Sequence, residues 1–278
     1  MRIQSRSAQR PLAYGVNYAS PQARGLVGWW PLDRARGLRN MVGPTSGAYT
    51  GTVAGTPLLG ICHDIDDSTD STLVTTYTAL NDLTQLTLSA WYTSRTAGGG
   101  SLGRIVDKNN LGNGWNIQSK GAGSMGFEFR RWSVTNGEWS FPCPAMDASS
   151  AVMPHHVAVS YDTAGGTGAV PLVLIDGVLR TTTTLSTPAG VATDSEVSDL
   201  RIGNRSDLSR TWDGTLADIR VYNRAMTAAE MLALWDQATR WELYSTVAQK
   251  VGTIVSGNAI AAAGWGALMD GRRNRLVA

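Results

Sequence analysis

Between residues 25 and 223, apolar and polar positions alternate with the short period of β-strands rather than with the period of helices. Runs rich in Val, Ile, Thr, Leu and aromatic residues recur, and Gly, Asn, Asp and Pro separate them. Two antiparallel sheets packed face to face are the simplest way to bury one face of each such strand. The strands predicted in this way are 26–30, 85–92, 125–132, 156–161, 170–175, 199–202 and 216–222.

Two local signals add detail to these strands. Alternation within 125–132 assigns Phe127 to one face and Glu128 to the other, as expected of a half-buried strand. The dipeptide Asp176-Gly177 lies between two apolar runs and predicts a two-residue hairpin, because a type I′ turn needs positive φ at both central positions. The strands are therefore expected to be half buried, with at least one tight hairpin.

One short helix is predicted near the end of this region. Thr227 and Glu230 have the spacing of a capping box, in which two side chains satisfy backbone donors at a helix start. The helix is expected to continue to about Thr239, and the apolar residues that recur along it are Met231, Leu234 and Trp235. The predicted fold class is therefore all-β, with one short C-terminal helix.

Charge divides the chain into parts that the alternation does not reveal. Lys and Arg number 24 and Asp and Glu number 22, so the net charge of +2 excludes a strongly basic nucleic-acid binder. Residues 1–24 contain four arginines and no acid, and residues 240–278 contain four arginines and one lysine against two acids. The region between these basic ends is therefore net acidic.

This distribution suggests three parts. They are an extended basic N-terminal arm (1–24), a folded domain (25–240) and a Gly- and Ala-rich basic C-terminal arm (241–278). We expect the arms to bind partner proteins, with apolar groups supplying contact area and arginines supplying ion pairs. The residues assigned to this role are Arg2, Arg6, Arg10, Tyr14, Tyr18, Arg24, Arg272, Arg273 and Arg275.

Several segments resemble, in order, the concanavalin A-like jelly rolls of the laminin-G-like group. They are GLVGWWPLD (25–33), LTLSAWY (86–92), HHVAVSYD (155–162), LVLIDGV (172–178) and WDGTLADIRVYNRAMTAAEM (212–231). The last is the most specific, because it joins an aromatic-Asp-Gly turn, an alternating strand and a capped helix. The resemblance implies a two-sheet antiparallel jelly-roll sandwich over about 25–240, in a family that includes glycan binders, peptide binders, calcium-dependent modules and enzymes.

No catalytic constellation is evident. The β-glucanases of this fold carry alternate carboxylates on one strand as E-x-D-x-E, whereas here Glu128 is followed by Phe129 and two arginines. No serine lies in a nucleophile elbow, and the pair His155-His156 is interpreted as structural. The chain also lacks C-x-x-C, Walker and G-x-G-x-x-G contexts. We therefore expect a non-enzymatic protein without an organic cofactor.

Two kinds of ligand site remain candidates. Calcium binding would use hard oxygen ligands from a loop rim, here Asp64, Asp66, Asp67, Asp70 and Asp213, although solvated turn carboxylates explain the same pattern. Glycan binding would use an aromatic shelf with polar neighbours. The residues considered for that shelf are Trp115, Trp132 and Trp139, beside Asn116, Gln118, Asn136 and Glu138. Tryptophans that fill the core are the alternative.

Neither cysteines nor apolar segments indicate export or a membrane span. Cys62 and Cys143 form no disulfide framework, and whether they pair is left open. The basic N-terminus lacks the apolar run of a signal peptide. The uncharged stretch 251–269 is dominated by small residues, which favours an arm packed on protein over a transmembrane helix.

A laminin-G-like jelly roll that begins with Met1 and has two basic arms resembles the jelly-roll proteins of tailed bacteriophage virions. That resemblance implies a capsid decoration or cement protein, assembled in the host cytoplasm and located in the virion. Its expected partners are the major capsid protein, other virion proteins and copies of itself, with no nucleic acid and no membrane. The alternative is a glycan-binding tail-fibre adhesin or lectin module.

Overall fold

The computed structural model describes residues 14–33, 39–43, 48–56, 58–66, 70–74, 77–109, 113–147, 149–193 and 198–246. The chain divides into two compact units, 1–245 and 246–278, and almost all described residues belong to the first. Several predicted positions lie outside the described residues. They are Arg2, Arg6, Arg10, Asp67, the stretch 251–269, Arg272, Arg273 and Arg275.

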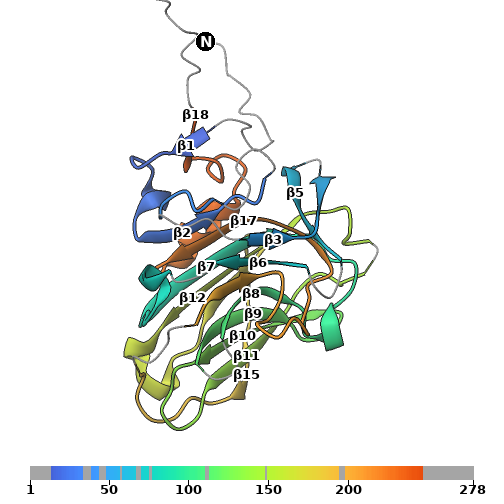
Figure 1. Cartoon of the computed structure of the whole chain (residues 1–278). Helices are drawn as coiled ribbons and strands as arrows, with labels where there is room; N and C mark the ends of the chain where they lie inside the picture. Colours follow the sequence, from blue (N-terminus) through green and yellow to red (C-terminus); the bar gives the residue numbers. More distant parts are fainter. Residues whose placement is uncertain are drawn as a thin grey trace, which may run out of the picture. The chain divides into compact units, whose positions relative to one another are not determined.

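Two large antiparallel sheets make up most of the described part of the first unit (Figure 1). Sheet 1 contains, from edge to edge, β15 (Thr183–Ser186), β11 (Gly137–Pro142), β10 (Ser124–Arg130), β9 (Gly114–Ser119), β8 (Arg104–Asn109), β16 (Leu200–Ile202), β6 (Ser71–Val74) and β3 (Ala48–Thr50). Sheet 2 contains β14 (Val178–Arg180), β13 (Leu172–Ile175), β12 (His155–Asp162), β7 (Gln85–Tyr92), β17 (Gly214–Tyr222), β5 (Gly60–Ile65) and β4 (Thr52–Thr56), with β2 (Leu26–Trp30) also paired to β17.

The main hydrophobic core lies between the two sheets. Sheet 1 contributes Trp115 and Phe127, and sheet 2 contributes Leu88, Val157 and Val221, all fully buried or nearly so. Each apolar side chain of this size stabilises the fold by about 1.5–3 kcal/mol when it is removed from water. The prediction of an all-β, two-sheet antiparallel sandwich is therefore confirmed, and each of the seven predicted strands overlaps an observed one.

The predicted hairpin turn and the predicted helix cap are also confirmed. Asp176 and Gly177 have φ values of 51° and 72° and join β13 to β14. Helix α1 (Ala228–Trp235) begins after Thr227 with the complete capping box. It is shorter than predicted, because Asp236 takes ψ 135° and its carboxylate accepts a hydrogen bond from the Ala238 amide, which ends the helix.

Both ends of the described chain pack on the second face of sheet 2. Strands β1 (Tyr14–Val16) and β18 (Tyr244–Thr246) pair with each other, and Figure 1 shows them side by side. The short helix η1 (Pro21–Ala23) contacts α1, and the buried Gln22 donates hydrogen bonds to the carbonyls of Ala233 and Thr239. The predicted N-terminal arm 1–24 is therefore wrong for residues 14–24, which belong to the folded unit and satisfy polar groups beneath them.

A buried ion pair ties these ends to the sheet. Arg220 and Asp218 lie 2.7 Å apart in β17, and the side chain of each is only 1% exposed. Asp218 accepts hydrogen bonds from the Trp29 indole (2.6 Å) and the Tyr244 hydroxyl (2.8 Å), and Arg220 donates to the Gln22 amide oxygen (2.7 Å). The most specific family-like segment of the sequence is thus a structural junction.

The remaining single-turn helices complete the described elements. They are η2 (Thr78–Leu80), η3 (Gly99–Ser101) and η4 (Thr163–Gly168).

Candidate functional site

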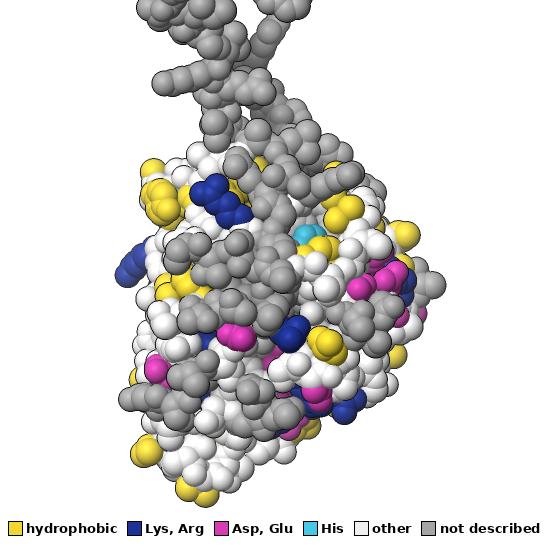
Figure 2. Space-filling model, in the orientation of Figure 1, with side chains coloured by type: hydrophobic (Ala, Val, Ile, Leu, Met, Phe, Trp, Pro, Cys, Tyr) yellow, Lys and Arg dark blue, Asp and Glu magenta, His cyan; other side chains and the backbone are white. Residues whose placement is uncertain are grey.

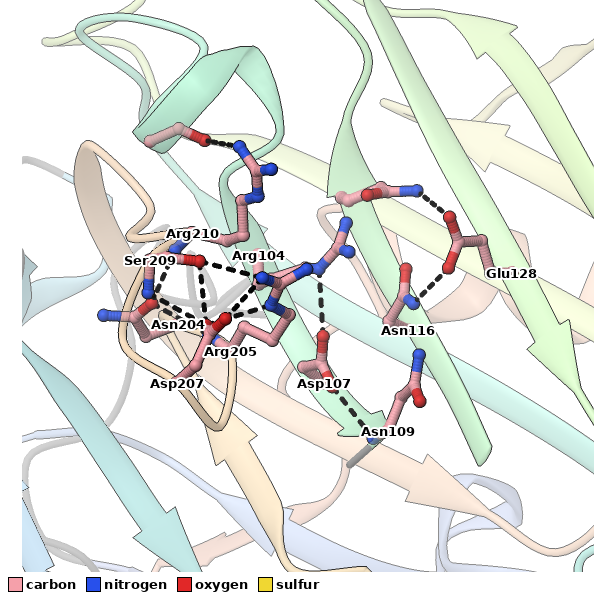
Figure 3. Close-up of polar contacts among 12 residues, drawn as sticks. Arg104, Asp107, Asn109, Asn116, Glu128, Asn204, Arg205, Asp207, Ser209 and Arg210 are labelled. Atoms are coloured by element: carbon pink, nitrogen blue, oxygen red, sulfur yellow. Dashed lines mark hydrogen bonds and ion pairs between the residues drawn. The ribbon is translucent and has the colours of Figure 1, made fainter. Parts of the chain in front are cut away.

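Five polar side chains form a row across the outer face of sheet 1, each opposite the next in the strand register. In order across the strands they are Arg201 (β16), Asp107 (β8), Asn116 (β9), Glu128 (β10) and Glu138 (β11). We call this set the polar row. Its members alternate along their strands with core residues such as Trp115 and Phe127, so they face away from the core. Figure 3 shows three of them, Asp107, Asn116 and Glu128.

Glu128 accepts three side-chain hydrogen bonds on this face. Its carboxylate accepts hydrogen bonds from the side-chain amides of Asn116 (2.8 Å) and Gln118 (2.6 Å) and from Arg130 Nε (2.8 Å). Burial by itself would raise the pKa of Glu128, but the hydrogen bond and charge of Arg130 and the Asn116 amide lower that pKa to about 2. Glu128 is therefore an anion held by three donors.

A second carboxylate, Asp107, lies in the same row but has the opposite shift. Arg104 Nε donates to Asp107 Oδ2 at 2.9 Å, and the Asn109 amide donates to Asp107 Oδ1 at 2.8 Å. Burial raises the pKa of Asp107 to about 6 in spite of Arg104. A register shift between Arg104 and Val106 brings Arg104 onto the same face as Asp107, because a bulge changes the alternation by one residue.

Several buried atoms of this face have no hydrogen-bond partner among the residues that the structure describes. The carboxylate of Glu128 can only accept, so both amide nitrogens must face it, and Oδ1 of Asn116 and Oε1 of Gln118 are left unpaired. Arg104 Nη1 is a buried donor without a partner. A buried, unsatisfied polar atom costs about 1–3 kcal/mol, which a bound hydroxyl or water would recover.

Lys120 lies over part of this face. A Cβ atom on Gly126 would come within 2.9 Å of Lys120 carbons, so the Lys120 stem packs where β10 has no side chain. Gly126 is directly opposite Gln118 in the register. The Lys120 ammonium contacts Glu138 and lies 3.7 Å from Glu128. The flexible Lys120 side chain thus lies between Glu128 and Glu138 at this end of the row.

A loop at residues 203–211 borders the row, where the Arg104 amide donates a hydrogen bond to the Arg210 carbonyl at 2.9 Å. Arg205 and Asp207 pair within the loop, whose polar contacts lie beside Arg104 and Asp107 in Figure 3. Leu208, Ser209 and Thr211 of the same loop line a pocket of about 280 Å³. Its polar lining includes Asp66, Thr96, Ser209 and Asp213.

The predicted aromatic shelf is wrong. Trp115 and Trp139 are completely buried, Trp132 is 7% exposed, and all three belong to the core between the sheets. Their polar neighbours Asn116 and Glu138 face the opposite side, because adjacent residues of a strand cannot share a face. Asn116, Gln118 and Glu138 do belong to the polar face. The residues that sequence reasoning missed are Glu128, Arg104, Asp107 and Lys120; for Glu128, its alternation with Phe127 was an available signal.

The predicted calcium ligands that the structure describes, Asp64, Asp66, Asp70 and Asp213, do not assemble an ion site. Asp64 and Asp213 both bind Arg95, and Asp70 accepts a hydrogen bond from the Asp66 backbone amide at 3.2 Å. Within the described residues, no group of three or more Asp, Glu, His or Cys side chains is placed to hold a metal. These residues therefore do not fit a calcium ion in this arrangement.

The described part of the arms gives a mixed result. Tyr14 is fully buried and donates a hydrogen bond to Asp33, so its assignment to partner binding is wrong. Tyr18 (74% exposed) and Arg24 are exposed, and their partner role stays a prediction. Cys62 and Cys143 do not form a disulfide with each other. No helix within the described residues is long and apolar enough to cross a membrane.

Charges on the surface are mixed. Figure 2 shows basic and acidic side chains interspersed over the described part of the face it presents. The described charges of this face are therefore not of a single sign.

Comparisons with known proteins agree with this fold. The binding domain of botulinum neurotoxin DC in complex with rat synaptotagmin II has a TM-score of 0.56 and 13% identity, over 78% of this chain and 52% of that chain. The same domain in complex with SialylT has a TM-score of 0.54 and 12% identity, over 76% and 50%. The receptor binding domain of botulinum neurotoxin D has a TM-score of 0.55 and 11% identity, over 76% and 52%.

This chain thus spans only about half of those binding domains, and at such identities the likeness shows the fold alone. No curated protein matches the sequence. Residues 66–231 match the family described as the concanavalin A-like lectin/glucanases superfamily, which is more than half of the chain. With its two antiparallel sheets and closing helix, the chain belongs to the concanavalin A-like lectin/glucanases superfamily.

Proposed function

We propose that this chain is a non-enzymatic binding module that recognises a neutral saccharide through the polar face of sheet 1. The observation that carries the proposal is the set of unpaired buried atoms beside Glu128. Two of them, on Asn116 and Gln118, are acceptors, and one, on Arg104, is a donor. A sugar hydroxyl both donates and accepts, so adjacent hydroxyls of one sugar suit this mixture.

The charges of the face favour a neutral ligand over an ionic one. Each carboxylate there is matched by a nearby cation, in the pairs Asp107–Arg104, Glu128–Arg130 and Glu138–Lys120. An anionic ligand would meet three carboxylates, and a cationic ligand would meet carboxylates that are already paired. The pKa of Glu128, lowered to about 2, also keeps this carboxylate ionised near neutral pH, which suits a hydrogen-bond acceptor better than a general acid.

The structural neighbours support a role in recognition. One neurotoxin binding domain of similar fold was captured with rat synaptotagmin II and with SialylT. These ligands belong to the neurotoxin domains. For this chain they are consistent with a module that binds receptors or glycans.

Replacement of Gln118 by alanine tests the proposal. We expect the wild-type protein to bind at least one member of a panel of neutral oligosaccharides saturably in calorimetric titration. Gln118→Ala should weaken that binding by up to about tenfold, since one hydrogen bond is worth about 0.5–1.5 kcal/mol. Gln85→Ala is the matched control, because Gln85 is exposed on sheet 2 and contacts Asp162. Wild-type protein that binds no sugar of the panel, or equal binding by both variants, contradicts the proposal.

A second candidate is a capsid decoration or other virion protein, with the major capsid protein or further copies of this chain as partners. The observation in its favour is that β1 pairs with β18. The basic segments 1–13 and 247–278 therefore join the domain at adjacent strands, which suits attachment at one end and display of sheet 1. The exposed Tyr18 lies next to this point in sequence.

Removal of residues 2–13 tests the attachment role. The described contacts of residues 14–24 would remain, so we expect an unchanged melting temperature. If the basic segment binds the particle, the truncated protein should be lost from purified virions in sedimentation. Removal of residues 2–24 is not a suitable test, because it also removes the contacts of Gln22 and Tyr14 and would destabilise the domain itself. Normal incorporation of the shorter truncation would rule out this attachment role.

A further inference from the structure

Arg95 joins three segments at the loop rim beside the pocket. It follows β7, and it contacts the end of β5 and the residue that precedes β17. Its Nε donates to Asp213 Oδ1 at 2.7 Å, its Nη1 to Asp64 Oδ1 at 2.9 Å, and its Nη2 to the Ile65 carbonyl at 2.9 Å. One guanidinium group thus binds two carboxylates and one backbone carbonyl.

These three oxygens are the kinds of ligand that calcium takes in proteins, namely carboxylates and backbone carbonyls from separate loops. We infer that the Arg95 guanidinium is a built-in cation that takes the place of a divalent metal ion at this rim. The guanidinium group is planar and has several N–H donors in fixed directions, so it can bond to all three oxygens at once. A lysine ammonium is a compact charge and cannot reproduce this geometry.

The arrangement also shapes the adjacent pocket. The second oxygen of Asp213 accepts a hydrogen bond from the Thr96 hydroxyl at 2.7 Å, and both residues line the pocket. The Arg95 backbone amide donates to the Asp213 carbonyl at 2.8 Å, so side chain and backbone hold the same pair of loops together. The pocket wall is therefore positioned by a covalently attached cation and does not depend on the calcium concentration.

Substitution of Arg95 by serine tests this inference with calcium and terbium as probes. We expect the wild-type melting temperature to be unchanged by millimolar calcium, and its tryptophans to sensitise no terbium luminescence. Arg95→Ser should melt at a lower temperature, regain part of the loss in calcium and show terbium luminescence, because two carboxylates lose their cation. The double variant Arg95→Ser/Asp213→Asn should show neither the recovery of melting temperature in calcium nor the terbium luminescence.

Arg205→Ser is the matched control, since Arg205 pairs with one carboxylate among the described residues, that of Asp207 in a neighbouring loop. It should gain neither calcium response nor terbium luminescence. Arg95→Gln is measured in parallel because it fills more of the space. Wild-type protein that is stabilised by calcium and loses that effect on Asp213→Asn overturns the inference. The inference is also overturned if neither Arg95→Ser nor Arg95→Gln binds terbium, or if neither variant folds even in the presence of calcium.

Discussion

Replacement of Arg220 by methionine is expected to lower the free energy of unfolding by about 3–5 kcal/mol, because it leaves Asp218 as a buried charge without its cation. Both side chains are 1% exposed, so water cannot take the place of the lost partner. Arg220 also donates to Gln22 and lies over the rings of Trp29 and Tyr244 at 5.8 and 5.9 Å. The variant therefore loosens both chain ends from sheet 2.

The structure offers a closely matched control for this measurement. Arg205 and Asp207 are also two residues apart and paired, but their side chains are 21% and 37% exposed. Arg205→Met should cost no more than about 1 kcal/mol, as exposed pairs do. Urea unfolding of Arg220→Met and Arg205→Met measures how much free energy of unfolding each variant loses. Adding Asp218→Asn to Arg220→Met should restore part of the lost stability, because it removes the unpaired buried charge. A loss below about 1 kcal/mol for Arg220→Met alone would contradict this explanation.

Acidification from pH 6.5 towards pH 3 is expected to destabilise the wild-type protein more than the His156→Gln variant. His156 is fully buried, shares a 2.8 Å hydrogen bond with the Ser89 hydroxyl and packs against the Trp91 ring. Burial, with the charge of Arg220, lowers the pKa of His156 from 6.5 to about 3. The unfolded chain takes up a proton below pH 6.5 and the folded chain does not, so stability falls as the pH falls through this window.

Asp107 acts in the opposite direction over part of the same range. Its folded-state pKa is raised from 3.8 to about 6, so its protonation stabilises the fold as the pH falls from about 6 to 4. The shift of His156 is larger, and one pKa unit corresponds to about 1.4 kcal/mol, so the histidine decides the net sign. Below pH 4.5 the lowered pKa of Glu128 adds to the loss.

Urea unfolding at a series of pH values measures this balance. In His156→Gln the contribution of Asp107 is left unopposed, so stability should rise as the pH falls from about 6 to 4. In Asp107→Asn the contribution of His156 is left unopposed, so stability should fall more steeply than in the wild type. Equal slopes for wild type and His156→Gln would show that His156 takes up a proton in the folded state.

Much of the fold is predictable because it depends on local patterns. Strand 85–92 appears within the same bounds as β7, the Asp176-Gly177 turn has both positive φ values, and the Thr227 capping box is complete. Burial of one strand face, a turn of fixed handedness and a helix cap each involve residues close in sequence. Such features need no knowledge of what else packs on the element.

The candidate site was predicted only in part. Asn116, Gln118 and Glu138 were considered with the wrong partners, since the tryptophans beside them in sequence face the core. The pair Arg104–Asp107 was out of reach, because the two residues are three apart and share a face only through a bulge. Alternation cannot foresee a bulge, which is a response of one strand to its neighbour.

By itself, the sequence determined the strand pattern, the all-β class, the family resemblance and the start of the closing helix. Only the tertiary structure decided that residues 14–24 belong to the domain, that Arg95 binds the rim carboxylates and that the polar face centres on Glu128. The physical reason is distance along the chain. Gln22 bonds to Thr239, and Arg95 to Asp213, across more than a hundred residues, so these contacts exist only after the sheets have placed their ends together.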